Sequence, residues 1–237
     1  MAYRAAMAQQ EAAATAEQDR AQDPAQDGGG WPVAVGTTAL SVPVPEADAL
    51  VAHWRARYDT AARHGGTAHL TVLFPFLHRS GVGPAERAAL AGLFAGHPPF
   101  TVEFARCGRF PGVLHLVPEP AAPLRALTRA VAARWPEHPP YGGLFGELDP
   151  HLTVANTGGA AVHRAIEARL AGHLPVRARI RAVDLVVHDG RRWVPWLSFP
   201  LGAEAAGGTG ADDGRPGGPA APPPGGAARG AAGAQGR

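Results

Sequence analysis

The tetrapeptide His-Leu-Thr-Val occurs twice in this chain of 237 residues, at positions 69–72 and again at positions 151–154. The unperturbed pKa of histidine lies close to neutral pH, so two imidazoles can divide the roles of proton acceptor and proton donor. Threonine hydroxyls beside them can hydrogen-bond oxygen atoms on which negative charge gathers. The four polar residues therefore carry the groups needed for acid–base cleavage of a phosphodiester.

Both copies are expected to be β-strands, because the rest of each stretch is apolar. Residues i and i+2 of a strand share a face, so His69 and Thr71 should point one way while Leu70 and Val72 enter the core. The same alternation applies to the second copy. If a pseudo-twofold axis relates the two surroundings, the His-Thr pairs face each other across a cleft.

The elements around the two copies occur in the same order before and after about Gly112: strand, helix, His-Leu-Thr-Val strand, helix, strand. We predict an α+β fold of two pseudo-symmetric lobes, each a small, mainly antiparallel sheet with outer helices, flanking a central cleft. Hydrophobic periodicity and Pro or Gly punctuation predict four helices, over residues 46–62, 84–95, 122–134 and 161–171. The other strands are expected within residues 31–45, 100–108, 112–120, 176–190 and 191–201, the last two joined by an Asp189-Gly190 hairpin turn.

Composition divides the chain into three parts. Residues 1–30 are rich in Ala, Gln, Glu and Asp, and residues 202–237 are rich in Gly, Ala and Pro, with few large apolar side chains in either. Such segments bury too little surface to offset the entropy of ordering them. We expect disordered tails at 1–30 and 202–237 and a single folded domain over residues 31–201.

All 22 basic residues are arginine, and the absence of lysine excludes Schiff-base enzymes, lysyl-nucleotide ligases and Walker-type phosphate loops. Residues 31–201 hold 17 Arg against 12 Asp and Glu, a mild surplus that suits a small anionic ligand. Cys107 is the only cysteine, so an intramolecular disulfide and a cysteine metal cluster are excluded. No signal peptide or membrane span is recognisable, which predicts a cytoplasmic protein that uses no membrane.

On these residues the chain resembles the 2H phosphoesterase superfamily, which contains bacterial 2'-5' RNA ligase-like proteins and cyclic phosphodiesterases. The hallmark is a duplicated H-x-T/S-x-hydrophobic motif, here separated by 82 residues, and "FPGVLHLVPEP", "YGGLFGELDPHLTVAN" and "RRWVPWLSFPL" also resemble that superfamily. The resemblance implies that His69 and His151 are the catalytic acid and base and that Thr71 and Thr153 bind the substrate phosphate. It implies no cofactor, no metal and no obligatory protein partner.

The substrates implied are nucleotides or RNA ends with a 2',3'-cyclic phosphate or a 2'-5' linkage, and the reverse reaction would join RNA ends without ATP. A non-catalytic RNA- or nucleotide-binding module with the same cleft is the alternative. A metal-dependent hydrolase using His69, His151 and His115 is a second alternative, although His115 is expected to be a structural or rim residue. Tyr141 and Arg109 are candidate substrate contacts outside the motifs.

Overall fold

The computed structural model describes residues 33–144 and 149–202, and everything said below concerns these two ranges. The predicted tails, 1–30 and 202–237, lie outside them apart from Gly202. Within the described residues the elements are β1 (Thr38–Pro43), α2 (Pro45–Tyr58), α3 (Thr60–Arg63), β2 (His69–Leu73), η1 (Arg79–Gly81), α4 (Pro84–Ala95), β3 (Phe100–Phe110), β4 (Val113–Glu119), α5 (Ala122–Arg134), η2 (Pro140–Gly143), β5 (Leu152–Ala155), α6 (Gly159–Leu170), η3 (Ala171–His173), β6 (Val176–Ile180), β7 (Ala182–His188) and β8 (Trp193–Pro200).

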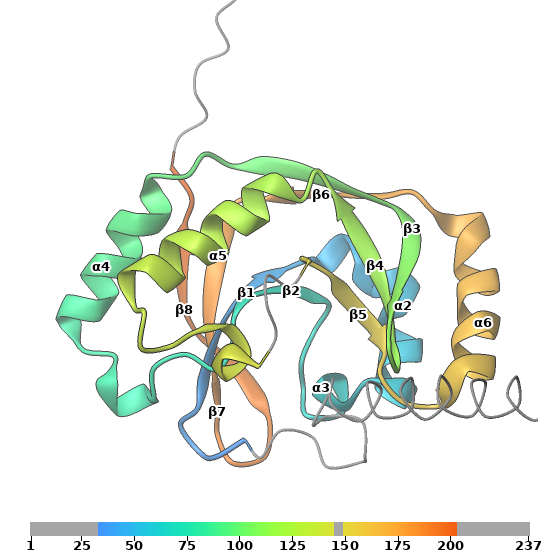
Figure 1. The fold of residues 1–237 in the computed structure, drawn as a ribbon, viewed down its shortest axis with the longest axis horizontal. Coiled ribbons are helices and arrows are strands. Elements are labelled where there is room, and N and C mark those ends of the chain that lie inside the picture. Colours follow the sequence, from blue (N-terminus) through green and yellow to red (C-terminus); the bar gives the residue numbers. More distant parts are fainter. Residues whose placement is uncertain (1–32, 145–148, 203–237) are drawn as a thin grey trace, which may run out of the picture. The chain divides into compact units, whose positions relative to one another are not determined.

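The strands form two antiparallel sheets of four, in the spatial orders β2-β1-β7-β8 and β5-β4-β3-β6. Helices α4 and α5 pack on the first sheet, and helices α2 and α6 pack on the second (Figure 1). The predicted α+β class, with two small antiparallel sheets and outer helices, is confirmed. The predicted helices 84–95 and 122–134 match α4 and α5 residue for residue.

The expected helix over residues 46–62 is two helices, because the backbone at Asp59 is extended, with φ −117° and ψ 120°. The Asp59 side chain accepts a hydrogen bond from the backbone N–H of Ala61 and so caps the N-terminus of α3. This interruption turns the chain after α2 toward the strand that carries the first His-Leu-Thr-Val copy.

The two sheets do not coincide with the two halves of the chain, which corrects the simplest form of the duplication. Strands β3 and β4 flank Gly112 and pair with each other in one sheet, although they come from different halves. Strand β7, from the second half, pairs with β1 of the first half. The first half therefore lends β3 to the sheet that carries the second motif, and the second half lends β7 and β8 to the sheet that carries the first.

The single strand predicted over residues 176–190 is wrong, because Arg181 divides it between the two sheets: β6 pairs with β3 and β7 pairs with β1. Buried positions fall on Ala178 and Ile180 before this point and on Val183 and Leu185 after it. The alternation thus changes phase between the two sheets, so even-numbered residues are buried in β6 and odd-numbered residues such as Val183 and Leu185 are buried in β7. The Asp189-Gly190 turn joins β7 to β8 as expected.

Both motif strands lie at the edge of their sheets, β2 in one and β5 in the other, and these two edges lie next to each other. One continuous hydrophobic core runs behind them and includes Leu70, Val72, Leu152 and Val154. The sheets therefore present both copies of His-Leu-Thr-Val at a common border.

Candidate active site

The predicted division of each motif strand into two faces is confirmed. Leu70 and Val72 are no more than 3% exposed, whereas His69 and Thr71 are half-buried and turn away from the core. In the second copy Leu152 and Val154 are fully buried and the histidine and threonine are again half-buried. The structure thus brings all four polar motif residues to the border between the sheets.

Each motif histidine is held by the same backbone hydrogen bond. Nδ1 of His69 lies 2.7 Å from the carbonyl oxygen of Thr67, and Nδ1 of His151 lies 2.9 Å from the carbonyl oxygen of Asp149. A carbonyl can only accept, so Nδ1 carries the hydrogen in both rings. In the neutral imidazole the Nε2 lone pair then remains available to take a proton from a substrate or a water molecule.

The surroundings of both rings favour the neutral form. Burial, followed by the positive charge of Arg55 and the proximity of His151, lowers the pKa of His69 from 6.5 to about 4, although the hydrogen bond to Thr67 acts in the opposite direction. Burial also lowers the pKa of His151, although the carbonyl and carboxylate of Asp149 act in the opposite direction. Both imidazoles are therefore proton acceptors at neutral pH until a bound anion favours the charged form of one.

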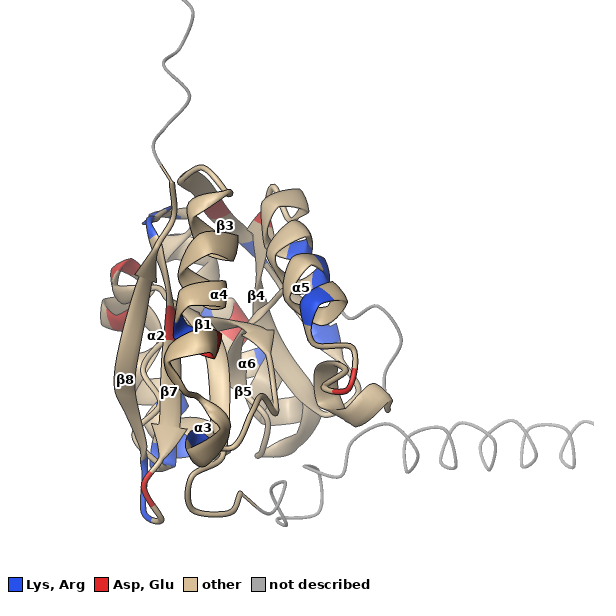
Figure 2. Ribbon diagram, turned by 90° about the vertical axis from the view of Figure 1, so that its left-hand side faces the viewer, with Lys and Arg blue, Asp and Glu red and all other residues tan. Residues whose placement is uncertain are grey.

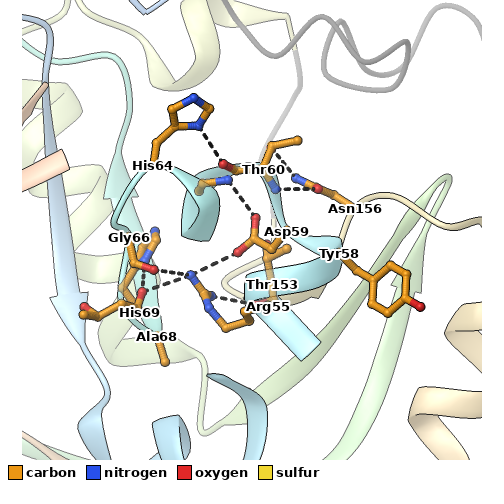
Figure 3. Close-up of polar contacts among 12 residues, drawn as sticks. Arg55, Tyr58, Asp59, Thr60, His64, Gly66, Ala68, His69, Thr153 and Asn156 are labelled. Carbon is orange, nitrogen blue, oxygen red and sulfur yellow. Dashed lines mark hydrogen bonds and ion pairs between the residues drawn. The ribbon is translucent and has the colours of Figure 1, made fainter. Parts of the chain in front are cut away.

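The guanidinium of Arg55 joins the two motif segments. From α2, Nη1 donates to the carbonyl of Thr153 at 2.7 Å, and Nη2 donates to the carbonyls of Gly66 and Thr67 at 3.1 and 3.0 Å (Figure 3). Nη2 also pairs with the carboxylate of Asp59 at 3.0 Å, and both side chains are 2% exposed. One buried cation therefore bridges backbone on either side of the border between the sheets.

A second connection follows the end of β5. Asn156 accepts a hydrogen bond from the backbone N–H of Thr60 and donates one to the Thr60 hydroxyl, at 3.0 and 2.9 Å, and its own N–H donates to the carbonyl of Tyr58 (Figure 3). These bonds attach the end of the second motif strand to the junction of α2 and α3, so the helix and the strand cannot shift independently.

A third histidine lies beside the second motif. In the strand register His115 is opposite Thr153 on one side and Gly108 on the other, so all three share the face that carries His151. Its ring stacks on Phe110 at a centroid distance of 4.2 Å and meets the His151 ring edge-on at 5.4 Å. Burial and the neighbouring His151 lower the pKa of His115 to about 4, so it is a neutral aromatic wall for His151.

The two candidate contacts outside the motifs are placed differently. The backbone of Tyr141 is left-handed, with φ 52°. Its N–H donates a hydrogen bond to the carbonyl of Phe74, and its ring meets the Phe74 ring edge-on at a centroid distance of 6.1 Å. This places it past the end of the first motif strand. The guanidinium of Arg109 pairs with Glu167 of α6, and its register partner is the fully buried Leu114, on the strand face opposite His115. The structure therefore holds Arg109 to a helix and not to the motif histidines.

Two other chemistries find little support in the described ranges. Residues 33–144 and 149–202 contain no group of three His, Cys, Asp or Glu side chains arranged to hold a metal ion. Burial raises the pKa of Cys107 to about 11, which suppresses the thiolate that a nucleophilic cysteine needs.

No helix in the part of the chain described here has the length and apolar character to cross a membrane.

A family model described as the 2'-5' RNA ligase superfamily matches residues 43–192, a span that contains both motif strands, Arg55 and His115. The chain belongs to the 2'-5' RNA ligase superfamily. The resemblance to 2H phosphoesterases seen in the sequence is thereby confirmed, whereas a search of curated proteins finds no match.

Solved structures with a similar chain include two of Escherichia coli LigT, one complexed with NADP+ and one with ATP. Sequence identities are 21% and 18%, each comparison has a TM-score of 0.44, and they cover 71% of this chain and 98% and 99% of LigT. A protein of Thermus thermophilus is 19% identical over 71% of this chain and 99% of its own, with a TM-score of 0.49.

Sequence reasoning found the four motif residues of this superfamily member but missed the groups that hold them. Arg55 is one of several arginines in a helical pattern, and only its position on the buried face, in line with Val51, distinguishes it. Asn156 lies two residues after the second motif, so its place in "HLTVAN" was a usable signal. His115 was a candidate only as a metal ligand, and its ring contact with His151 follows from the pairing of β4 with β5.

Replacing Arg55 by methionine is expected to lower the free energy of unfolding by about 3–5 kcal/mol, because the Asp59 carboxylate would stay buried without its cation. The carbonyls of Thr67 and Thr153 would also lose a donor. Denaturant unfolding measures the change. Arg57→Met, at an exposed position of the same helix, is the matched control and should change stability by less than about 0.5 kcal/mol. Equal effects of the two substitutions would contradict the bridging role.

The lowered histidine pKa values predict a stability that declines in weak acid. The folded-state pKa of His69 is about 4 against 6.5 for the free side chain, so the unfolded chain takes up the proton first as the pH falls. Stability is complete above pH 6.5 and is lost between pH 6.5 and about 4, by up to about 1.4 kcal/mol per pH unit for each such histidine. Urea unfolding of His69→Gln should show a shallower decline across this window, whereas the exposed His173→Gln should keep the wild-type slope. Identical slopes for the two variants would refute the neutral state of His69.

Proposed function

We propose that this protein hydrolyses 2',3'-cyclic phosphates or 2'-5' phosphodiester bonds of nucleotides or RNA ends, in the cytoplasm and without a metal cofactor. One observation carries the proposal. Two neutral histidines, each with Nδ1 bonded to a backbone carbonyl and Nε2 available, lie on adjacent edge strands with a threonine beside each. Membership of the 2'-5' RNA ligase superfamily supports a nucleotide or RNA substrate.

In the proposed reaction, Nε2 of one motif histidine takes a proton from the attacking water as its oxygen bonds to phosphorus. The other histidine, protonated at Nε2, gives its proton to the departing ribose oxygen as the P–O bond breaks. The negative charge of the bound phosphate raises the pKa of this second imidazole, which offsets the lowering caused by burial. In the reverse direction a 5'-hydroxyl replaces water, loses its proton to one histidine and attacks the phosphorus of a 2',3'-cyclic phosphate. The P–O3' bond breaks, the other histidine protonates the departing 3'-oxygen, and a 2'-5' bond remains without use of ATP.

The hydroxyls of Thr71 and Thr153 are proposed to donate hydrogen bonds to the non-bridging phosphate oxygens. Each threonine lies two residues after its histidine and on the same strand face, so each pair presents one proton-transfer group and one donor to the same phosphate. The donors gain strength as negative charge gathers on these oxygens in the transition state.

Alanine in place of either His69 or His151 is expected to lower kcat by about 10²–10⁴, the contribution typical of a general acid or base. Turnover of 2',3'-cyclic nucleotides and of short 2'-5' linked oligomers is measured in the presence of EDTA. His173→Ala, on the exposed η3 segment, is the matched control and keeps wild-type activity. Unchanged rates in either motif variant would overturn the two-histidine mechanism, and a wild-type protein that binds nucleotides without turnover would favour the binding-module alternative.

Valine in place of Thr71 or Thr153 keeps the shape of the side chain and removes only the hydroxyl. We expect kcat to fall by about 10²–10³, as for the loss of one donor to a developing oxyanion. Folding is followed by thermal unfolding, and the loss should be in kcat more than in KM. A change confined to KM would assign the hydroxyls to ground-state binding and contradict their role in the transition state.

A further inference from the structure

A pocket of about 370 Å³ opens beside the second motif, next to Pro150. It lies along the face of β3 and β4 that carries Gly108, Phe110 and His115. Thr153 of β5 is opposite His115 in the strand register and so shares this face. Its volume falls within the range of about 300–1,000 Å³ that is usual for small-molecule sites. Its lining includes Arg106, Phe110, His115, Glu119, Arg125 and Asp149.

The rim of the pocket is polar and carries charges of both signs. Arg106 donates from both Nε and Nη2 to the Glu119 carboxylate, at 3.2 and 3.1 Å, and Arg125 pairs with Asp149. Basic positions are prominent along α5, which carries Arg125 (Figure 2). At the pocket, Arg106 and Arg125 each stand next to a lining carboxylate, and Arg109 pairs with Glu167 outside the lining, so the rim offers donors and acceptors side by side.

The floor is aromatic and contains a polar atom without a partner. Phe110 is half-buried and stacks on His115, and Gly108 lies so close below the imidazole that a Cβ there would stand 2.4 Å from Nε2 of His115. His115 is 5% exposed, and its Nδ1 has no hydrogen-bond partner in the described structure.

We propose that this pocket is the subsite for the nucleobase of the nucleotide whose phosphate is bound by the two motifs. The proposal rests on the proposed function, because binding of the substrate phosphate by the two motifs fixes which end of the substrate enters the pocket. An aromatic floor suits the flat face of a base, and paired carboxylates and guanidiniums suit an edge that carries both donors and acceptors. The pocket borders Asp149 and Pro150, directly before His151, so it adjoins the scissile phosphate.

A second phosphate group is a poorer occupant than a base. Glu119 and Asp149 would repel an anion at the same rim where Arg106 and Arg125 attract it, whereas a neutral base meets no such opposition. We therefore expect the pocket to distinguish one nucleobase from another and not to select for longer RNA chains with more phosphate groups.

The test compares the four 2',3'-cyclic mononucleotides with 1-O-methylribose 2',3'-cyclic phosphate, which lacks a base. We expect kcat/KM for the best nucleotide to exceed that of the ribose compound at least tenfold. Glu119→Gln should reduce this ratio at least fivefold and change the order of preference among the bases. Glu103→Gln breaks the comparable exposed pair with Arg177 outside the pocket and should leave the ratio unchanged.

Equal turnover of the nucleotides and the ribose compound by the wild-type protein, or base preferences unaltered in Glu119→Gln, would overturn the subsite. If no compound is turned over, the proposed function fails and calorimetry with nucleoside 3'-monophosphates and ribose 3-phosphate decides on the subsite separately. Tighter binding of the nucleotides that weakens in Glu119→Gln would support it, and equal binding would refute it.

Discussion

The arrangement of this site depends on one buried cation. Desolvating the guanidinium of Arg55 is costly, and the cost is offset only where a carboxylate and several carbonyls surround it at hydrogen-bond distance. Here the carbonyls of Thr67 and Thr153 belong to segments adjoining or within the two motif strands, and Asp59 supplies the counter-charge. The two motif strands must keep a fixed relative position for these bonds to form. The burial of the Arg55 side chain therefore constrains the distance between the two motifs.

The same cation also influences the proton chemistry. The carbonyl of Thr67 accepts hydrogen bonds from both Arg55 and Nδ1 of His69, so the group that orients the imidazole is itself held by the cation that lowers its pKa. His151 lies after Asp149, whose charge favours its protonated form. The two histidines have the same local geometry in different electrostatic surroundings, which is the condition for dividing the roles of base and acid.

The exchange of strands explains why the two lobes act together. Because β3 completes the sheet of the second motif and β7 completes the sheet of the first, neither sheet can form from one half of the chain. The helices follow the same rule, since α2 packs against β5 and α5 packs against β2. Folding of either lobe therefore requires both halves, and the motif strands are positioned by one shared core.

The sequence alone determined the features that depend on local order. The repeat of His-Leu-Thr-Val identified the polar residues, period-two alternation separated His69 and Thr71 from the core, and punctuation by proline and glycine located α4 and α5. These properties are set by neighbours along the chain, so they can be predicted without knowledge of the fold.

Only the tertiary structure decided which strands pair and what surrounds the motif histidines. The phase change after Ile180, by which one predicted strand becomes two in different sheets, can be interpreted only once the pairing of the strands is known. Arg55 and His115 approach the motifs through contacts between segments distant in the chain, and the cost of desolvating each depends on partners that local sequence does not specify. Side-chain alternation is a local property, whereas burial and pairing are properties of the whole fold.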